Sequence, residues 1–259
     1  MHKQLHIALI QIDLIWEQPQ ANRDAIERMV TTITDTVDVI VLPEMFTTGF
    51  SMNAVKFAES ITGKSVTWMK TLASKMQAAV MGSLIIEDAG KYYNQLVFVY
   101  PNGELSSYKK RHTFTLAGED KVYTMGNERV IINYKGWLLY PLVCYDLRFP
   151  VWSRYNNDYH VLLFVANWPK VRVAAWNALL QARAIENMSY CIGVNRVGID
   201  GKGHEYSGHS ACYNPLGETI SAFVENENGY RIVVLNKDEL TTTRERFKFL
   251  DDRDNFTLK

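Results

Sequence analysis

The sequence predicts an α/β protein in which helices cover strands that are buried on both faces. Short apolar runs recur along the whole chain, and most are continuous rather than alternating, which is typical of strands covered on two sides. Three segments between these runs carry apolar residues at helical spacing. Strands joined by helices indicate α/β layering, and the short turns at 102–103 and 214–217 add some hairpins.

Each of the apolar runs is predicted to form a strand. In chain order they are 5–10, 37–42, 79–86, 96–100, 137–143, 161–165, 190–194, 210–213 and 231–235. A first helix is predicted between the first two runs, where apolar residues recur at helical spacing from 25 to 37. A second helix is predicted to follow Lys64, and a third to cover about 174–188.

The composition is that of one ordinary folded domain spanning 1–259. Hydrophobic residues make up 47% of the 259 residues and charged residues 22%, which excludes a disordered chain. The 28 basic and 28 acidic side chains cancel, which removes the electrostatic case for a nucleic-acid or anionic-membrane partner. No apolar stretch reaches the roughly 18 residues of a membrane span. Three cysteines and an N-terminus without a signal-peptide pattern predict a reduced, cytoplasmic protein.

The end of the chain differs in composition from the rest. Between 241 and 259, acidic and basic side chains crowd around Phe247, Phe249 and Leu250. One hypothesis for this charged arm is a solvated, partly frayed tail. The other is an arm that packs its aromatic residues on a partner subunit.

Two segments place a charged side chain close to the end of an apolar run. The run 37–42 stops at Pro43, which cannot donate a ladder hydrogen bond, so Glu44 follows at the rim where ligand crevices open in layered α/β proteins. Position alone favours an ordinary exposed glutamate in a turn. The basic run 109–112 is, taken alone, typical of a solvated loop.

A third segment ends at Cys144, with Asp146 and Arg148 close behind it. A free cysteine is more often a packing residue than a nucleophile, and Cys191 and Cys212 fit that interpretation because each lies in a predicted strand. Cys144 fits it less well, since a thiolate can be stabilised and reached at a strand end beside charged groups.

Other constellations of reactive side chains lack the spacing that their chemistry needs. His204, Glu205 and His209 do not have the His-Glu-x-x-His spacing, and the histidines and cysteines show no zinc pattern, so no metal site is predicted. A papain-like pair of Cys144 with His160 or His209 stays open, although the local signature around the cysteine is absent.

Taken together, the three segments resemble the nitrilase, or carbon–nitrogen hydrolase, superfamily, which carries a Glu–Lys–Cys triad in this order. The glutamate matches Glu44 in LPE, the lysine matches Lys110 in YKKRH, and the cysteine matches Cys144 in CYDLRFP. The resemblance covers nearly the whole chain, because NWP at 167–169 and ARAIEN at 182–187 also match.

The resemblance implies a four-layer α-β-β-α sandwich whose third helix is buried against a second subunit. A homodimer or higher homo-oligomer is therefore expected. It also implies a second glutamate in the loop after the lysine. Glu119 stands at the matching position, with Asp120 as the neighbouring alternative.

The side chains of this set suit the hydrolysis of an amide through a thioester. Cys144 is the nucleophile, and its thiol needs activation at neutral pH. Glu44 is the general base, which later protonates the departing ammonia. Lys110 and the backbone N–H of Tyr145 stabilise the oxyanion. Glu119 orients Lys110 or the substrate amide, and no metal or organic cofactor is required.

The sequence around the cysteine, CYDLRFP, most resembles that of the omega-amidase branch of the superfamily. That branch hydrolyses 2-oxo acid ω-amides such as 2-oxoglutaramate and 2-oxosuccinamate to ammonia and a 2-oxo dicarboxylate. A small anionic substrate needs a cation, and an arginine suits a carboxylate. Arg172 is the first candidate and Arg148 the second, although pairing of Arg148 with Asp146 or a strand-end carbonyl is favoured. Phe46 and Trp168 are expected to wall the pocket, unless they belong to the core.

Two other functions stay open. An N-carbamoyl or aliphatic amidase would use the same triad on a different small-molecule amide. A nitrilase-like scaffold would bind a ligand without turnover, but a scaffold has no need to keep Glu44, Lys110 and Cys144 together.

Overall fold

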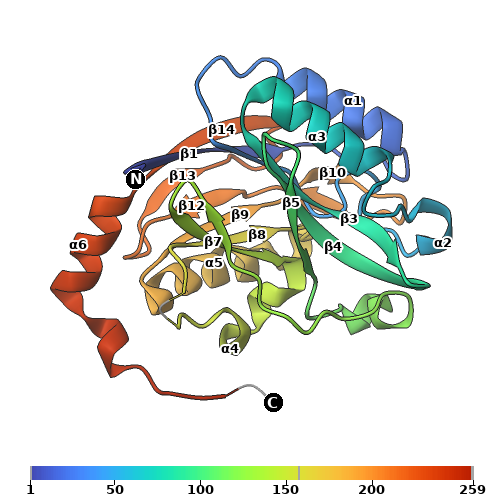
Figure 1. Cartoon of the computed structure of the whole chain (residues 1–259). Helices are drawn as coiled ribbons and strands as arrows, with labels where there is room; N and C mark the ends of the chain where they lie inside the picture. Colours follow the sequence, from blue (N-terminus) through green and yellow to red (C-terminus); the bar gives the residue numbers. More distant parts are fainter. Residues whose placement is uncertain (1, 157, 258–259) are drawn as a thin grey trace.

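Two six-stranded sheets lie face to face at the centre of the protein, and the helices cover their outer faces (Figure 1). The computed structural model describes residues 2–156 and 158–257. In order across the first sheet, the strands are β14 (Gly229–Asn236), β1 (Gln4–Gln11), β2 (Val39–Val41), β3 (Ala79–Asp88), β4 (Lys91–Val99) and β5 (Leu105–Lys109). The second sheet holds β13 (Thr219–Ala222), β12 (Ala211–Tyr213), β9 (Tyr190–Val194), β8 (Val161–Val165), β7 (Trp137–Val143) and β6 (Ile132–Tyr134).

Helices close the sandwich on both sides. Helices α1 (Pro19–Val30) and α3 (Lys64–Met76) pack on the first sheet, and α5 (Val173–Asn187) packs on the second. The short elements are α2 (Ala54–Phe57), α4 (Pro150–Ser153) and the separate hairpin of β10 (Val197–Ile199) and β11 (Glu205–Ser207). The expected four-layer α-β-β-α sandwich is confirmed.

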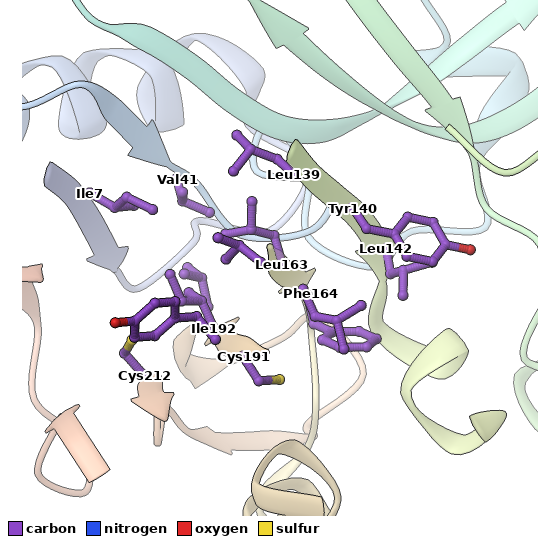
Figure 2. Packing of buried hydrophobic residues seen from close by; sticks show 14 of the residues in the cluster. Ile7, Val41, Leu139, Tyr140, Leu142, Leu163, Phe164, Cys191, Ile192 and Cys212 are labelled. Carbon is purple, nitrogen blue, oxygen red and sulfur yellow. The ribbon is translucent and has the colours of Figure 1, made fainter. Parts of the chain in front are cut away.

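Alternate side chains of the central strands enter different layers of the core. In β1, Ile7 lies in the layer between the sheets, whereas Ile10 packs with residues of α1 and α3. Figure 2 shows Ile7 and Val41 of the first sheet directed toward Leu163 of the second. Because both faces of these strands are buried, their sequences are continuous apolar runs.

The structure contains every predicted strand and helix, with differences at their ends. Strands β5, β6, β10, β11 and β13 were not predicted, because they are short or carry polar residues. The first helix ends at Val30, so the periodicity that extended it toward Val37 was wrong. Beyond the helix, the Thr31 hydroxyl donates to the carbonyls of Glu27 and Arg28, and both Ile33 and Val37 still reach the core.

Part of the charged arm packs against its own chain while most of its described residues are exposed, so both hypotheses for the arm stay predictions. Asn236 is the N-cap of helix α6 (Lys237–Phe247), and its side chain accepts hydrogen bonds from the backbone N–H groups of Asp238 and Glu239. Leu240 is buried, and Arg244 donates to backbone carbonyls at the end of α5 and before β8.

None of the helices in the described part of the chain is long and apolar enough to cross a membrane.

Candidate active site

The predicted catalytic side chains meet where β2, β5 and β7 end. Glu44 follows β2, Lys110 follows β5 and Cys144 follows β7, while Glu119 begins the 3-10 turn η2 (Glu119–Lys121). Glu44 and Glu119 are 0% exposed and Lys110 is 2% exposed. Glu44 is therefore not the exposed turn residue that its position alone favoured, and the basic run does not place Lys110 in a solvated loop.

Lys110 joins the two carboxylates. Its Nζ lies 3.0 Å from Oε1 of Glu44 and 2.9 Å from each carboxylate oxygen of Glu119. The backbone N–H of Phe114 donates to Oε2 of Glu119 at 2.5 Å. Glu119, rather than the exposed Asp120, is therefore the carboxylate that contacts Lys110.

Two asparagines complete the surroundings of Glu44. The backbone N–H of Asn167 donates to Glu44 Oε2 at 2.8 Å, and the Asn167 side chain donates to the Glu44 backbone carbonyl at 2.6 Å. Nδ2 of Asn94, on β4, lies 2.8 Å from Glu44 Oε1 and 3.2 Å from Glu119 Oε1. These contacts hold the Glu44 carboxylate in one orientation.

Cys144 sits at a sharp turn between β7 and the 3-10 turn η3 (Cys144–Arg148). Its φ angle is +43°, a left-handed conformation that a residue with a side chain rarely adopts and that tends to occur at functional sites. The turn places the thiol close enough to Glu44 for that carboxylate to raise the pKa of the thiol.

The charges of the cluster set the resting protonation state. Burial raises the pKa of the Cys144 thiol, as does the Glu44 carboxylate, and the Lys110 ammonium only partly offsets this. Burial alone would lower the pKa of Lys110, but the Glu119 and Glu44 carboxylates outweigh it and raise that pKa above its usual value. The cluster therefore holds a neutral thiol and an ammonium ion, and the thiol needs a base to remove its proton.

A buried carboxylate, Asp146, ties the lysine to the cysteine turn. It accepts the backbone N–H of Val143 at 3.0 Å, just before the nucleophile. It also accepts the Tyr108 hydroxyl at 2.9 Å and the His112 backbone N–H at 3.0 Å. Since Tyr108 and His112 flank Lys110 in the chain, these bonds fix the lysine segment against the cysteine.

A cavity opens onto Glu44, Lys110 and Cys144. Arg148 and Arg172 both line it, and each stacks on an aromatic ring: Arg148 lies 4.9 Å from the ring centroid of Trp168 and Arg172 lies 5.2 Å from that of Phe114. The other lining residues are Phe50, Ala117, Tyr145, Asn167, Pro169, His204 and Tyr206.

Two of the predicted placements are wrong. Phe46 does not line the cavity but is fully buried between the first sheet and α3, where its ring lies 5.7 Å from that of Trp68. Arg148 does not pair with Asp146, because Tyr108 and His112 occupy that carboxylate.

Trp168 and Tyr145 do line the cavity, as predicted. Neither His160 nor His209 lines it, so the structure does not form a papain-like pair with Cys144. Within residues 2–156 and 158–257, no group of three or more His, Cys, Asp or Glu side chains could hold a metal ion.

Sequence reasoning missed several residues at the site, among them the lining residues Phe50, Phe114 and Ala117. His204 and Tyr206 reach the cavity from the β10–β11 hairpin, and Asn94 and Ser83 stand behind Glu44. The signal for the last pair is that a serine and an asparagine interrupt buried strands that are otherwise apolar.

A thiol, a buried carboxylate and a lysine grouped beside a cavity at the ends of strands define a cysteine hydrolase that cleaves carbon–nitrogen bonds. Residues 6–245 match the family described as carbon-nitrogen hydrolase, and the chain belongs to this family.

Relatives of known name cover the chain almost completely. It is 44% identical over 255 residues to the omega-amidase YafV of Escherichia coli K12, with 98% of each chain covered. It is 30% identical over 251 residues to a 2-oxoglutaramate amidase of Bacillus subtilis, covering 95% of this chain and 96% of that protein. A solved structure of a CN-hydrolase superfamily protein from Xanthomonas campestris, with an arsenic adduct in its active site, is 38% identical, has a TM-score of 0.96 and covers 100% of both chains.

Proposed function

We propose that this protein is an omega-amidase that hydrolyses the terminal amide of a small 2-oxo acid ω-amide, such as 2-oxoglutaramate or 2-oxosuccinamate. The observation that carries the proposal is the pair of arginines, Arg148 and Arg172, in the cavity above Cys144. Neither forms an ion pair with a carboxylate of the described residues, so both are free for an anionic substrate. Similarity to the omega-amidase of Escherichia coli and the 2-oxoglutaramate amidase of Bacillus subtilis supports the same substrate class.

The proposed reaction proceeds in two halves. Glu44 takes the proton from the Cys144 thiol, and the sulfur attacks the amide carbon. Lys110 and the Tyr145 N–H stabilise the oxyanion, each such donor contributing about 3–4 kcal/mol to lowering the barrier. Glu44 returns the proton to the leaving nitrogen, ammonia departs, and a thioester remains. Water, deprotonated by Glu44, then hydrolyses the thioester to the carboxylate and restores the thiol.

The proposal is tested by measuring ammonia release from 2-oxoglutaramate by the purified protein. The controls are the Cys144→Ala variant and an N-carbamoyl amino acid. Release that needs Cys144 and occurs only with the oxo-acid amide would support an omega-amidase. Turnover of the N-carbamoyl substrate instead would support an N-carbamoyl amidase. No ammonia release from either substrate, together with a Cys144 thiol no more reactive than that of free cysteine, would support a binding scaffold.

The Arg172→Ala variant is expected to raise KM for 2-oxoglutaramate about 10- to 100-fold, because a charge-assisted hydrogen bond contributes about 1.5–3 kcal/mol. KM for an uncharged amide of similar length should change little. Initial-rate kinetics on both substrates check this. The Arg148→Ala variant, measured in parallel, shows how much each arginine contributes to binding the substrate carboxylate. Equal losses on the charged and uncharged substrates would contradict the assignment.

A cytoplasmic location and a homodimer complete the proposal. The catalytic thiol and two further free cysteines suit a reducing compartment. Ile185 on α5 and Leu216 in the β12–β13 turn are 51% and 42% exposed, and this apolar face supports burial of α5 against a second copy. Light scattering should give twice the chain mass of 29.7 kDa.

A further inference from the structure

Two buried carboxylates share one ammonium ion at the active site. Among the described residues, Lys110 is the cation paired with Glu44 and Glu119. With both glutamates ionised, this buried group carries one excess negative charge. Burial raises the pKa of Glu119, and the nearby Glu44 adds to that rise against the opposing Lys110. The ionised pair therefore needs further hydrogen-bond donors.

Asn94 supplies those donors from β4. Its Nδ2 lies 2.8 Å from Glu44 Oε1 and 3.2 Å from Glu119 Oε1, so its two N–H groups can serve both carboxylates. The amide itself is 1% exposed and therefore has no solvent to compete for these bonds.

The orientation of this amide is fixed by Ser83 on the neighbouring strand β3. The Ser83 hydroxyl donates to Asn94 Oδ1 at 2.8 Å, and its oxygen accepts the backbone N–H of Met45 at 2.8 Å. Because the Ser83 oxygen already accepts the Met45 N–H, the Ser83 hydroxyl proton is the one donated to Asn94 Oδ1. A flipped amide would lose this bond and would turn its oxygen toward two carboxylates.

We propose that Asn94 is a positioning residue that keeps Glu44 and Glu119 ionised side by side, so that Glu44 can act as the base. Its contact also selects the reacting oxygen. Lys110 and Asn94 both donate to Glu44 Oε1, whereas Oε2 receives the single N–H of Asn167. Oε2 keeps a free lone pair and takes the Cys144 proton: the S–H bond breaks, an O–H bond forms at Oε2, and the electron pair stays on the sulfur.

The test compares Asn94→Asp with Gln95→Glu, an equivalent change at the next position of the same strand. The Gln95 side chain is also buried but contacts Ser107. Asn94→Asp replaces two donors by a third negative charge. We expect kcat for 2-oxoglutaramate to fall about 100-fold or more with little change in KM. Gln95→Glu should keep the kcat of the folded protein within about twofold, while thermal unfolding reports the loss of stability from its buried carboxylate.

The second readout needs no substrate, and it is the pH dependence of Cys144 alkylation by iodoacetamide. The titratable groups that face Glu44 and Glu119 are the Lys110 ammonium after β5 and the neutral Cys144 thiol on η3, with the neutral Tyr123 hydroxyl beside Glu119. A third carboxylate disfavours loss of the thiol proton. The midpoint of the alkylation profile should therefore move up by about one pH unit in Asn94→Asp and stay in place in Gln95→Glu.

Ser83→Ala provides a second variant that keeps the two donors but releases the amide. It should lower kcat about tenfold and shift the alkylation profile in the same direction. An unmoved profile in Asn94→Asp would overturn the proposal, even with lower turnover, because the loss would then be structural. If Asn94→Asp does not fold, an unmoved profile in Ser83→Ala overturns it. The turnover assay rests on the proposed function, whereas the alkylation profiles do not, so wild-type protein that released no ammonia would refute only that function.

Discussion

Replacing Glu44 by glutamine is expected to lower kcat about 1,000- to 10,000-fold, because the amide cannot take the proton of the Cys144 thiol. Burial and the surrounding carboxylates raise the pKa of that thiol, so without a base little thiolate forms at neutral pH. The fold should persist, since Lys110 keeps Glu119 at 2.9 Å from both of its oxygens. Ammonia release measures the loss, and thermal unfolding shows that the variant is folded.

The matched control for this variant is Glu59→Gln. Glu59 is partly buried and accepts hydrogen bonds from Ser65, but it lies away from the cavity. Its change should leave kcat within about twofold. A Glu44→Gln enzyme that retained a tenth or more of wild-type kcat would show that another group removes the thiol proton.

Replacing Lys110 by methionine is expected to abolish turnover and to lower the free energy of unfolding by about 3–5 kcal/mol. The loss of stability arises because Glu44 and Glu119 would be left buried without their cation. The loss of turnover arises because the oxyanion would lose its positive charge. Urea denaturation measures the first effect and ammonia release the second.

Two companion variants separate stability from catalysis. Lys109→Met, one position away, removes a lysine that pairs with the exposed Asp88 and should cost less than about 1 kcal/mol. Adding Glu119→Gln to Lys110→Met removes one uncompensated charge and should restore part of the stability, but none of the turnover. A Lys110→Met protein as stable as the wild type would refute the view that Lys110 neutralises this buried group.

The strand ends that carry the motifs could be predicted from the sequence, but the catalytic roles of Glu44, Lys110 and Cys144 came from the resemblance to the carbon–nitrogen hydrolases, because position alone favoured an exposed glutamate and a solvated basic run. Glu44 after Pro43, and Cys144 before a charged turn, each break an apolar strand where a crevice opens. The burial of those strands on both faces follows from the continuous apolar runs, whereas the four-layer arrangement was implied by the family resemblance.

The residues that were misplaced depend on contacts between distant parts of the chain. Arg148 lies close to Asp146 in sequence. The Asp146 carboxylate instead accepts hydrogen bonds from Tyr108 and His112, which are more than 30 residues away in the chain. Phe46 turns under the sheet because the missing side chain of Gly82 leaves room: a Cβ there would lie 2.8 Å from the Phe46 ring. Which side chains contact Asp146 or Phe46 depends on residues that are distant in the sequence, so no local sequence pattern predicts these contacts.

The pairing of the first strand with the last governs how the protein is completed on the ribosome. β1 pairs with β14 along its whole length, from Gln4 with Asn236 to Gln11 with Gly229. At about 5–20 residues per second, roughly 10–45 s separate the synthesis of the two strands. Until β14 emerges, β1 presents an open edge that can recruit strands of other nascent chains. Products that stop before residue 229 are therefore expected to aggregate, while chains that reach 236 seal the sheet with their own last strand.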